Sequence, residues 1–437
     1  MTTEVRRFLV RLGVVVAIGL IVRLAFMLIA HHPYEPHGDA LVYHAGANDL
    51  AQGKGFVLAF FLENGEQQQA ASNPPLYLIW LAIPSLLGFD NPLAHQLWSF
   101  VLGAGTIVVL GLLGRKLGGD RTGLIAALLA AVGPNFFYWD TVILAETMSL
   151  LTASVAVALA YHYWQSPDTR RLVLFGGACG VAALARAELA LLIPLVLIPL
   201  VIGTKELDRG AVLKRCVVGG LAALVVITPW LAYNQTRFEK TVLLSNGLGV
   251  TLAATQCDPA YRGELTGLWS PTCTLKVKNK FPKGFDESQR DAAYREAALE
   301  YLGDNVDRFP VVVLARWGRA LGLYELRHTL KFWHFPEGRD TILVWWGMGS
   351  VWVLGALSVF GALALRKRKI PVYPLVALPV IAMFAIGLTF ASERYRSTAE
   401  PALAVLAAVA IDSFIRRRRG EPELSDGITT EVGAPTS

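Results

Sequence analysis

The amino-acid sequence predicts an all-α, polytopic membrane protein: a bundle of about ten transmembrane helices that carries a loop domain on one face. Hydrophobic residues make up 54% of the 437 residues and charged residues only 17%, below the roughly 25% of an average soluble chain. The apolar residues also come in continuous blocks rather than in alternation, and a helix needs about 20 mostly apolar residues to cross a bilayer.

The apolar blocks follow one another along most of the chain. The first is too long for a signal peptide, contains Arg23 and lacks a small-x-small cleavage site, so we expect it to be retained as a span. Arg23 then either reaches outward to the interface or pairs with an acidic residue. In chain order, the blocks are residues 8–30, 92–113, 122–137, 144–164, 172–184, 189–202, 211–233, 343–365, 370–390 and 401–415.

The basic residues predict the orientation, because juxtamembrane Lys and Arg stay on the cytoplasmic side. With the N-terminus inside, the inner connections hold most of these residues, including the runs 366–369 and 416–419. We therefore expect a multi-pass protein of the plasma membrane (the cell inner membrane), with both termini cytoplasmic. The net charge of +6 reflects this bias, and we expect no nucleic-acid partner. The short outer connections hold only Lys54, Arg186, Arg394 and Arg396.

This topology divides the chain into four parts. An N-terminal transmembrane module covers residues 1–233 and includes a first outer loop, 31–91. An extracytoplasmic loop domain with helices covers 234–340. C-terminal transmembrane helices follow in 341–416, and 417–437 form a polar cytoplasmic tail that we expect to be disordered.

Several local patterns predict structure outside the spans. In the first outer loop, a short helix ends near Gly53 or Gly55, and Pro74-Pro75 begins another. In the loop domain, Asp286 caps an amphipathic helix over 286–305, and residues 309–324 form an apolar helix at the interface or re-entering the membrane. The aromatic run 136–139 is typical of a belt at the headgroup level.

The four cysteines fall into two groups. Cys257 and Cys273 both lie in the loop domain, and an exported loop is oxidising, so we expect a disulfide between them, with two free thiols as the alternative. Cys179 and Cys216 lie in spans, where inert packing residues are the usual case.

Acidic residues gather at the expected outer face. Asp39 follows the first span, where a carboxylate serves either as a general base or as the N-cap of the next helix. Asp140 and Glu146 form a second acidic pair that is a candidate acceptor site. Glu188 follows Arg186 at an outer turn, where the alternative is a local ion pair. Ionisable residues near a membrane are costly, so a functional site is a reasonable hypothesis.

Basic residues at the same face suggest phosphate binding. Arg394-Tyr395-Arg396 breaks the charge bias of the other connections, and the guanidinium group binds phosphate through a fixed fork of donors. The alternative is simple anchoring at the interface. Arg186, Arg316 and Arg319 are further candidates for contact with a lipid phosphate or headgroup.

No cofactor is required by the sequence. His31, His32, His37 and His44 cluster near Asp39, so a divalent metal remains an open alternative. Their spacing matches no strong ligand signature.

The order of these motifs resembles the GT-C superfamily of glycosyltransferases, in the branch of protein O-mannosyltransferases and aminoarabinose transferases. The resemblance covers about residues 5–415. The motifs are Asp39 with Tyr43, Gly53-x-Gly55, Asn73-Pro74-Pro75-x-Tyr77, Arg115-Lys116, Ala145-Glu146, Arg186-x-Glu188, Thr228-Pro229-Trp230 before Asn234, Arg394-Tyr395-Arg396 and Glu400-Pro401.

The resemblance implies an inverting transfer of a sugar from a polyprenyl-phosphate donor to an acceptor protein, glycan or lipid on the extracytoplasmic face. It implies that Asp39 is the catalytic base and that Arg394 and Arg396 hold the lipid phosphate. Two departures concern the acceptor subfamily: Gly38 and Ala40 flank Asp39 where many relatives have an acidic pair, and Ala187 stands where relatives often have proline.

Two other classes of function compete with this one. A transporter or flippase of a lipid-linked sugar needs alternating gates and little outer domain, but the acidic residues here lie outside rather than at mid-bilayer. A membrane-anchored scaffold leaves the polar outer residues unexplained.

Overall fold

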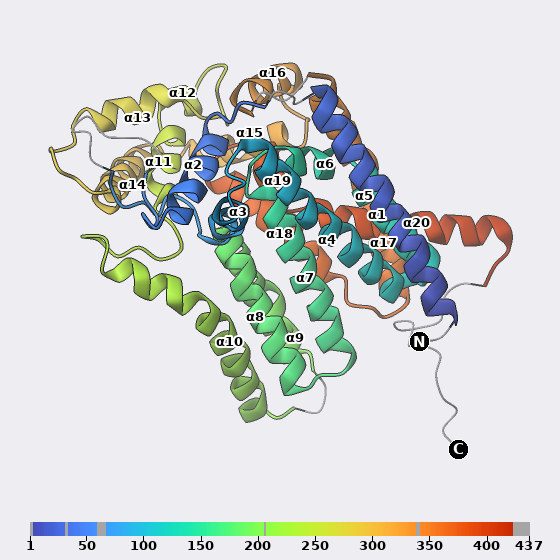
Figure 1. Cartoon of the computed structure of the whole chain (residues 1–437). Coiled ribbons are helices and arrows are strands. Elements are labelled where there is room, and N and C mark those ends of the chain that lie inside the picture. The colour runs from blue at the N-terminus through green and yellow to red at the C-terminus, as the bar shows by residue number, and fades with distance from the viewer. Residues whose placement is uncertain (1–2, 31–33, 59–66, 205–206, 338–340, 423–437) are drawn as a thin grey trace.

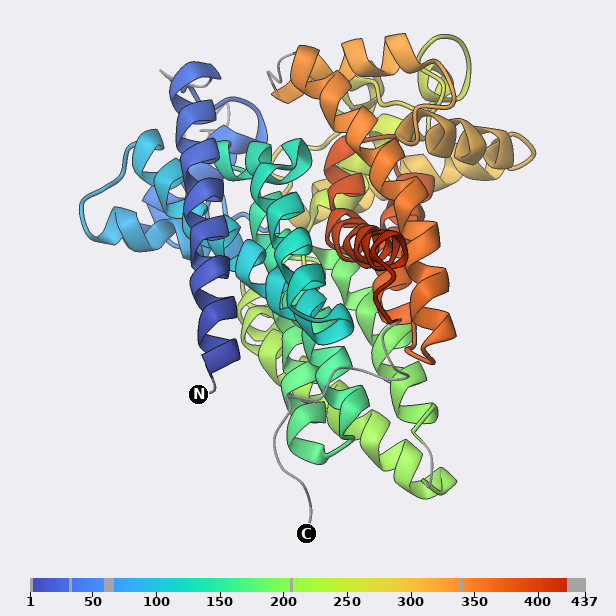
Figure 2. The same cartoon turned by 90° about the vertical axis from the view of Figure 1, so that its right-hand side faces the viewer.

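The computed structural model describes residues 3–30, 34–58, 67–204, 207–337 and 341–422. Over these residues the protein is helical, and the only β pairing is one antiparallel bridge between Val57 and Gln69. Figures 1 and 2 show a bundle whose loop helices gather at the end opposite the N-terminus.

Each predicted apolar block is helical. Within the described residues, four helices are long and apolar enough to cross a membrane: α1 (Thr3–Ala30), α4 (Pro92–Gly118), α10 (Arg209–Gln235) and α17 (Thr341–Lys367). A fifth span is formed if α5 (Asp120–Val132) and α6 (Pro134–Thr141), bent by 50°, count as one. The chain is therefore a multi-pass membrane protein, although the count of about ten spans is not confirmed.

The other blocks form shorter or more polar helices. Gly133 separates α5 from α6, which begins at Pro134. The block at 189–202 is broken into a 3₁₀ turn, a π turn and a short helix. These elements are α7 (Glu146–Gln165), α8 (Thr169–Ala185), η1 (Ala187–Leu191), η2 (Ile193–Leu197), α9 (Ile198–Ile202), α18 (Tyr373–Leu388) and α20 (Glu400–Arg419). Helix α20 continues through residues 417–419 of the expected tail, and residues 423–437 lie outside the described residues.

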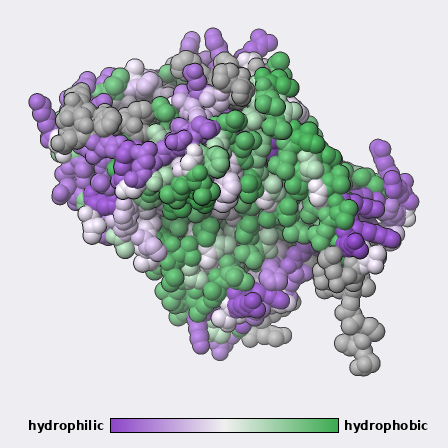
Figure 3. Space-filling view, in the orientation of Figure 1, coloured by the Kyte–Doolittle hydropathy of each residue, from purple (hydrophilic) through white to green (hydrophobic). Residues whose placement is uncertain are grey.

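Small residues bring the helices together. A Cβ atom on Gly176 of α8 would lie 2.2 Å from the carbonyl oxygen of Gly219 in α10, and one on Gly180 would lie 2.6 Å from that of Ala223. Two glycines four residues apart thus let the helix backbones touch, which is how helices associate without a hydrophobic driving force. The outer surface of the bundle is a band of apolar side chains between polar ends (Figure 3).

The aromatic run at 136–139 is not an interfacial belt, and that prediction is wrong. Phe136, Phe137, Tyr138 and Trp139 belong to α6 and are at most 2% exposed. They pack within the bundle because α6 turns inward after the bend at Pro134.

The first loop and the large loop form one layer over this end of the bundle (Figure 1). The first loop holds α2 (Asp39–Ala51) and α3 (Leu76–Leu86), which begins after Pro75 as expected. The large loop holds α11 (Gly247–Thr255), α12 (Asp258–Tyr261), α13 (Pro271–Lys278), α14 (Glu287–Asp304), α15 (Phe309–Ala320) and α16 (Leu326–Glu337). Asp286 caps α14 in a complete capping box with Gln289, as the sequence predicts.

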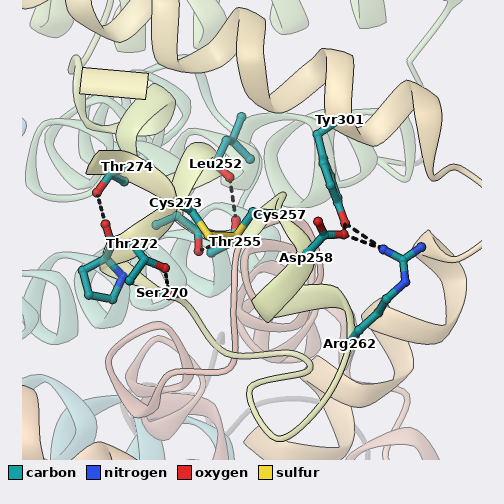
Figure 4. Close-up of a disulfide and its surroundings, with 12 residues drawn as sticks. Leu252, Thr255, Cys257, Asp258, Arg262, Ser270, Thr272, Cys273, Thr274 and Tyr301 are labelled. Carbon is teal, nitrogen blue, oxygen red and sulfur yellow. Dashed lines mark hydrogen bonds and ion pairs between the residues drawn. A yellow bond between two sulfur atoms is a disulfide. The ribbon is translucent and has the colours of Figure 1, made fainter. Parts of the chain in front are cut away.

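Covalent and polar links fix the large loop. Cys257 and Cys273 form a disulfide with a Cα–Cα distance of 6.3 Å. Figure 4 shows it beside Asp258, which accepts hydrogen bonds from Tyr301 at 2.8 Å and from Arg262 at 2.7 Å. The disulfide thus joins α12 to α13, and Asp258 joins α12 to α14.

Two side chains attach the first loop to the large one. Glu287 accepts hydrogen bonds from the amide of Ala71 at 2.5 Å and from the Ser72 hydroxyl. Arg237 donates to the carbonyl oxygens of Phe56 and Ala70, the latter at 2.9 Å. The segment of the first loop just before Asn73-Pro74 is therefore held against the large loop.

Candidate active site

A cavity of about 620 Å³ lies where the first loop, the large loop and the bundle meet. Its walls come from six parts of the chain that are distant in sequence. They are α2, the segment 72–74, the turn 185–191 after α8, the N-terminal half of α11 with the segment before it, one face of α14, and the segment 384–395 that joins α18 to α19 (Glu393–Ser397).

A chain of ion pairs forms the floor of the cavity. Arg394 donates to Oδ2 of Asp39 at 2.6 Å and to Oε1 of Glu146 at 2.7 Å. Arg186 donates to the same Glu146 oxygen at 2.6 Å and to Oε1 of Glu188 at 2.6 Å. These three carboxylates and two guanidinium groups therefore form one network with a net charge of −1.

Burial differs along this network. The Glu146 side chain is 0% exposed, whereas that of Asp39 is 53% exposed. Glu146 is the first residue of α7, where the partial positive charge of a helix N-terminus favours a carboxylate. It lies beneath the cavity wall and bridges the two arginines, while Asp39 faces the open space.

Local structure explains how the arginines reach this point. Arg394 is the second residue of the short helix α19, whose N-cap is Ser392: the Ser392 hydroxyl accepts from the Arg394 amide at 3.1 Å. Arg186 follows the last residue of α8 in an extended conformation, which turns its side chain back over Tyr395 at 5.0 Å from the ring centroid. Both guanidinium groups are thereby aimed at Glu146.

Two tyrosines line the same region. Burial raises the pKa of Tyr43, and the nearby charges of Glu146 and Asp39 raise it further, so its hydroxyl stays protonated. Burial likewise raises the pKa of Tyr395. Both side chains are neutral O–H groups that can donate hydrogen bonds in the cavity.

Another wall of the cavity belongs to the large loop and was not predicted from the sequence. Ser288, Asp291 and Arg295 follow one another at helical spacing on one face of α14. Asp291 accepts from the amide of Gly249 at 2.6 Å and lies 3.3 Å from Arg295 Nη1. The predicted helix and its spacing of three and four residues could have identified this face.

A third wall is apolar. Phe384 and Leu388 belong to α18, and Phe390 follows that helix. Leu243 and Leu248 come from the large loop. Phe384 is 55% exposed and Leu243 is 63% exposed, so the apolar wall continues to the surface. A hydrocarbon chain could lie along it while a polar group reaches the charged floor.

Three predicted site residues belong neither to the cavity wall nor to its ion-pair network. Asp140 is buried in the bundle, where Arg23 donates to it at 2.6 Å, so Arg23 does pair with an acidic residue. Arg316 is fully buried and donates to the carbonyl oxygens of Gly387 at 2.8 Å and of Thr255 at 3.0 Å.

The third of these residues is Arg396. It donates to the carbonyl oxygen of Ala320 at 3.0 Å and lies over the ring of Trp333. Arg316 and Arg396 thus connect α15 and α16 to the segment that forms the apolar wall, and their guanidinium groups are turned away from the cavity.

Asp39 does not cap α2. The N-cap is Gly38, with φ of 54°, and it makes no side-chain cap hydrogen bond; Asp39 is the first helical residue. A positive φ favours glycine, so Gly38 permits the turn that presents the Asp39 carboxylate to Arg394.

The histidines do not converge on Asp39. His44 lies 3.0 Å from His95 between ring nitrogens, and the exposed His37 lies 3.2 Å from the Glu35 carbonyl oxygen. His31 and His32 lie outside the described residues. In the part of the chain that the structure describes, no group of three or more His, Cys, Asp or Glu side chains is arranged to hold a metal ion.

Comparisons with known proteins agree with this architecture. Residues 72–233 match the model of the family described as dolichyl-phosphate-mannose-protein mannosyltransferase. No curated protein sequence matches the chain.

Solved structures resemble it in fold. The archaeal oligosaccharyltransferase AglB from Archaeoglobus fulgidus, in complex with an inhibitory peptide and a dolichol-phosphate, superposes with a TM-score of 0.56 at 15% identity over 94% of this chain and 51% of that one. The same oligosaccharyltransferase tethered to an acceptor peptide gives a TM-score of 0.56 at 14% identity, over 94% of this chain and 50% of that one.

ArnT from Cupriavidus metallidurans, bound to undecaprenyl phosphate, gives a TM-score of 0.44 at 15% identity, over 91% of this chain and 77% of that one. The chain spans about half the length of the archaeal oligosaccharyltransferase. The helical fold, the matching segment and the membrane spans agree with one another: the chain is a multi-pass membrane protein with the fold of the GT-C glycosyltransferases.

Proposed function

We propose that this protein is a glycosyltransferase that moves a sugar from a polyprenyl-phosphate donor to a hydroxyl group of a protein, glycan or lipid acceptor. The observation that carries the proposal is the juxtaposition in one cavity of an exposed carboxylate, Asp39, with the guanidinium groups of Arg394 and Arg186 and an apolar wall open to the surface. Each part fits one component of such a reaction.

The donor fits the arginines and the apolar wall. Arg394 and Arg186 lie where a phosphate would meet two fixed guanidinium groups, and guanidinium groups bind phosphate through charge-assisted hydrogen bonds. The prenyl chain would run along Phe384 and Leu388 towards the surface. The structurally similar AglB was solved with a dolichol-phosphate, which is a ligand of the same chemical class.

The reaction would proceed by inversion at the anomeric carbon. The acceptor oxygen forms a bond to that carbon while the bond from carbon to phosphate oxygen breaks. Asp39 takes the proton of the acceptor hydroxyl, and the bonding electrons leave with polyprenyl phosphate. Arg394 and Arg186 stabilise the charge that develops on the leaving phosphate, which is usually the largest single contribution to such a rate.

The orientation follows from the basic connections of the sequence. We place both termini in the cytoplasm of a cell with a plasma (inner) membrane and the cavity on the extracytoplasmic face. The disulfide of the large loop agrees with an oxidising compartment on that side.

The test is turnover by purified protein reconstituted in nanodiscs. The protein would be incubated with a panel of radiolabelled polyprenyl-phosphate sugars and a cell-envelope fraction as the pool of acceptors. Release of free polyprenyl phosphate together with label in a new product supports the proposal. A protein that instead moves an intact lipid-linked sugar across liposomes without cleaving it would be a flippase, the alternative function.

A further inference from the structure

We infer that binding of the donor phosphate releases the base: Arg394 holds Asp39 in an ion pair, and the phosphate displaces the Asp39 carboxylate from Arg394. This inference rests on the proposed function and concerns the order in which its parts assemble. The sugar donor would thus act as the switch that makes Asp39 available to the acceptor.

The first observation is that the Asp39 carboxylate and the Arg394 guanidinium group bind each other. Asp39 Oδ2 lies 2.6 Å from Arg394 Nη1, well within hydrogen-bond distance. While this pair persists, Oδ2 of Asp39 is directed at Arg394 rather than at an acceptor hydroxyl. An incoming phosphate competes with the same carboxylate for the Nη1 donor of Arg394.

The second observation is the charge of the network. Asp39, Glu146 and Glu188 outnumber Arg186 and Arg394 by one charge. A phosphodiester that enters this network adds a negative charge beside three carboxylates. One carboxylate must then leave its arginine so that the phosphate can pair with it. Removing Asp39 from the network leaves two carboxylates and two guanidinium groups, which can accommodate one phosphate.

The third observation is which carboxylate can leave. Glu146 is 0% exposed and bonded to both arginines, so its release would strand a buried charge. Asp39 makes its contact at the open side of Arg394 and its side chain is 53% exposed. An exposed ion pair contributes little free energy, so Asp39 is the member that a phosphate displaces at least cost.

The fourth observation is that polar groups share the cavity with Asp39. Asp39 is the first residue of α2 and lines the same cavity as Asn73, Asn246 and Ser288 of the loops. Its side chain is 53% exposed, so the freed carboxylate can change rotamer within the cavity while α2 stays in place. An acceptor hydroxyl bound there would meet the base only after the donor is seated.

The inference predicts an effect on binding that a purely catalytic base does not have. Removing the Asp39 carboxylate should tighten the binding of farnesyl phosphate, a short polyprenyl phosphate without a sugar, because Arg394 no longer has to exchange partners. Titration of farnesyl phosphate into detergent-solubilised Asp39→Asn protein should give a Kd roughly two- to tenfold below that of the wild type.

A matched control removes a different charge. Glu35→Gln deletes an exposed carboxylate four residues before Asp39 and should leave the Kd unchanged. Arg394→Gln should weaken binding, and in that background Asp39→Asn should have no further effect, because the two side chains act through one contact. Thermal unfolding of each variant confirms that it is folded.

The outcomes separate this inference from the proposed function. If the wild type binds farnesyl phosphate and Asp39→Asn binds it equally or more weakly, the inference is wrong and the proposed function stands. If Glu35→Gln tightens binding as much as Asp39→Asn, general electrostatics explains the effect and the inference is again wrong. If the wild type and Asp39→Asn both fail to bind farnesyl phosphate, the proposed function fails as well.

Discussion

Arg394 donates its Nε–H to Oε1 of Glu146 at 2.7 Å, although 248 positions separate the two residues in the chain. The same carboxylate oxygen accepts from Arg186 at 2.6 Å. A fully buried carboxylate at the start of α7 therefore aligns two arginines from different segments, and the geometry of the cavity floor depends on it.

Glu146→Gln should lower both stability and turnover. The variant leaves two guanidinium groups side by side without their shared counter-charge, and breaking a buried ion pair costs about 3 kcal/mol or more. Displacement of the arginines should reduce transfer about a hundredfold. Calorimetric unfolding measures the loss of stability, and donor turnover measures the loss of activity. Glu188→Gln is the control: the Glu188 side chain is 17% exposed, so its loss should have a milder effect. A Glu146→Gln protein as stable and active as the wild type would remove Glu146 from this role.

Lysine should not substitute for Arg394 in donor binding. Arg394 uses Nε for Glu146 and Nη1 for Asp39, a fork that one ammonium group cannot reproduce. The KM for the lipid-linked donor should rise about tenfold while the protein remains folded, because the positive charge is kept. Initial rates against donor concentration test this. A lysine variant with unchanged KM would mean that charge alone, and not the fork, is needed.

Arg23 and Asp140 should be required for folding and not for chemistry. Their ion pair at 2.6 Å is enclosed in the bundle, with the Thr147 hydroxyl also bonded to Asp140. Asp140→Asn should destabilise the protein by about 3 kcal/mol, whereas Arg23→Met with Asp140→Leu should recover part of that loss. Turnover per folded molecule should stay near wild type in both. Loss of turnover in a well-folded double variant would return Asp140 to the list of site residues.

The disulfide should stabilise the large loop. Cys257 and Cys273 are 16 positions apart, and closing a loop of that size stabilises a fold by about 3 kcal/mol. Cys273→Ser, or a reductant, should increase hydrogen exchange in α12 and α13. Cys216→Ser, which changes a free cysteine of α10, should leave that exchange unchanged. Equal protection with and without reductant would show that the disulfide does not support this loop.

Asp286 should make the stability of α14 depend on pH. Burial alone raises the pKa of Asp286, but the amides of Glu239 and Gln289 and the Ser288 side chain outweigh it and lower the pKa below the ordinary value of 3.8. The stabilisation is therefore complete above about pH 4 and is lost as the pH falls through the lowered pKa.

The cap can be tested by substitution. Asp286→Ala should destabilise α14 by about 1 kcal/mol at neutral pH, an effect that shrinks in acid. Asp304→Ala, at the other end of the same helix, should not do so, because an acid at a helix C-terminus is unfavourable. Hydrogen exchange of α14 at several pH values measures both. An unchanged exchange rate in Asp286→Ala would contradict the role of the cap.

Much of the cavity floor could be predicted from the sequence, because charged residues at the ends of apolar helices stand out against their surroundings. Asp39, Glu146, Arg186, Glu188 and Arg394 are all of this kind, and the structure brings them together. Their partners could not be predicted, since ion pairs between residues hundreds of positions apart depend on how the helices pack.

The sequence-based predictions that the structure does not support fail for physical reasons. Asp140 is close to Glu146 in sequence, but the break between α6 and α7 turns it towards Arg23 in α1. Arg316 and Arg396 are of a residue type that often contacts lipid headgroups, yet here they donate hydrogen bonds to backbone carbonyl oxygens inside the fold. An aromatic run packs equally well in a core or at an interface, so composition alone does not distinguish the two for residues 136–139.

One comparison measures whether Asp39 is the base in transfer from a polyprenyl-phosphate sugar. Wild-type and Asp39→Asn proteins would be supplied with the same radiolabelled donor and envelope acceptors, and the free polyprenyl phosphate released in the first turnovers would be measured. If Asp39 is the base, the wild type releases polyprenyl phosphate steadily, and the folded variant, whose amide cannot take a proton, loses about a hundredfold or more of that rate. Release at the wild-type rate by Asp39→Asn would contradict this role of Asp39.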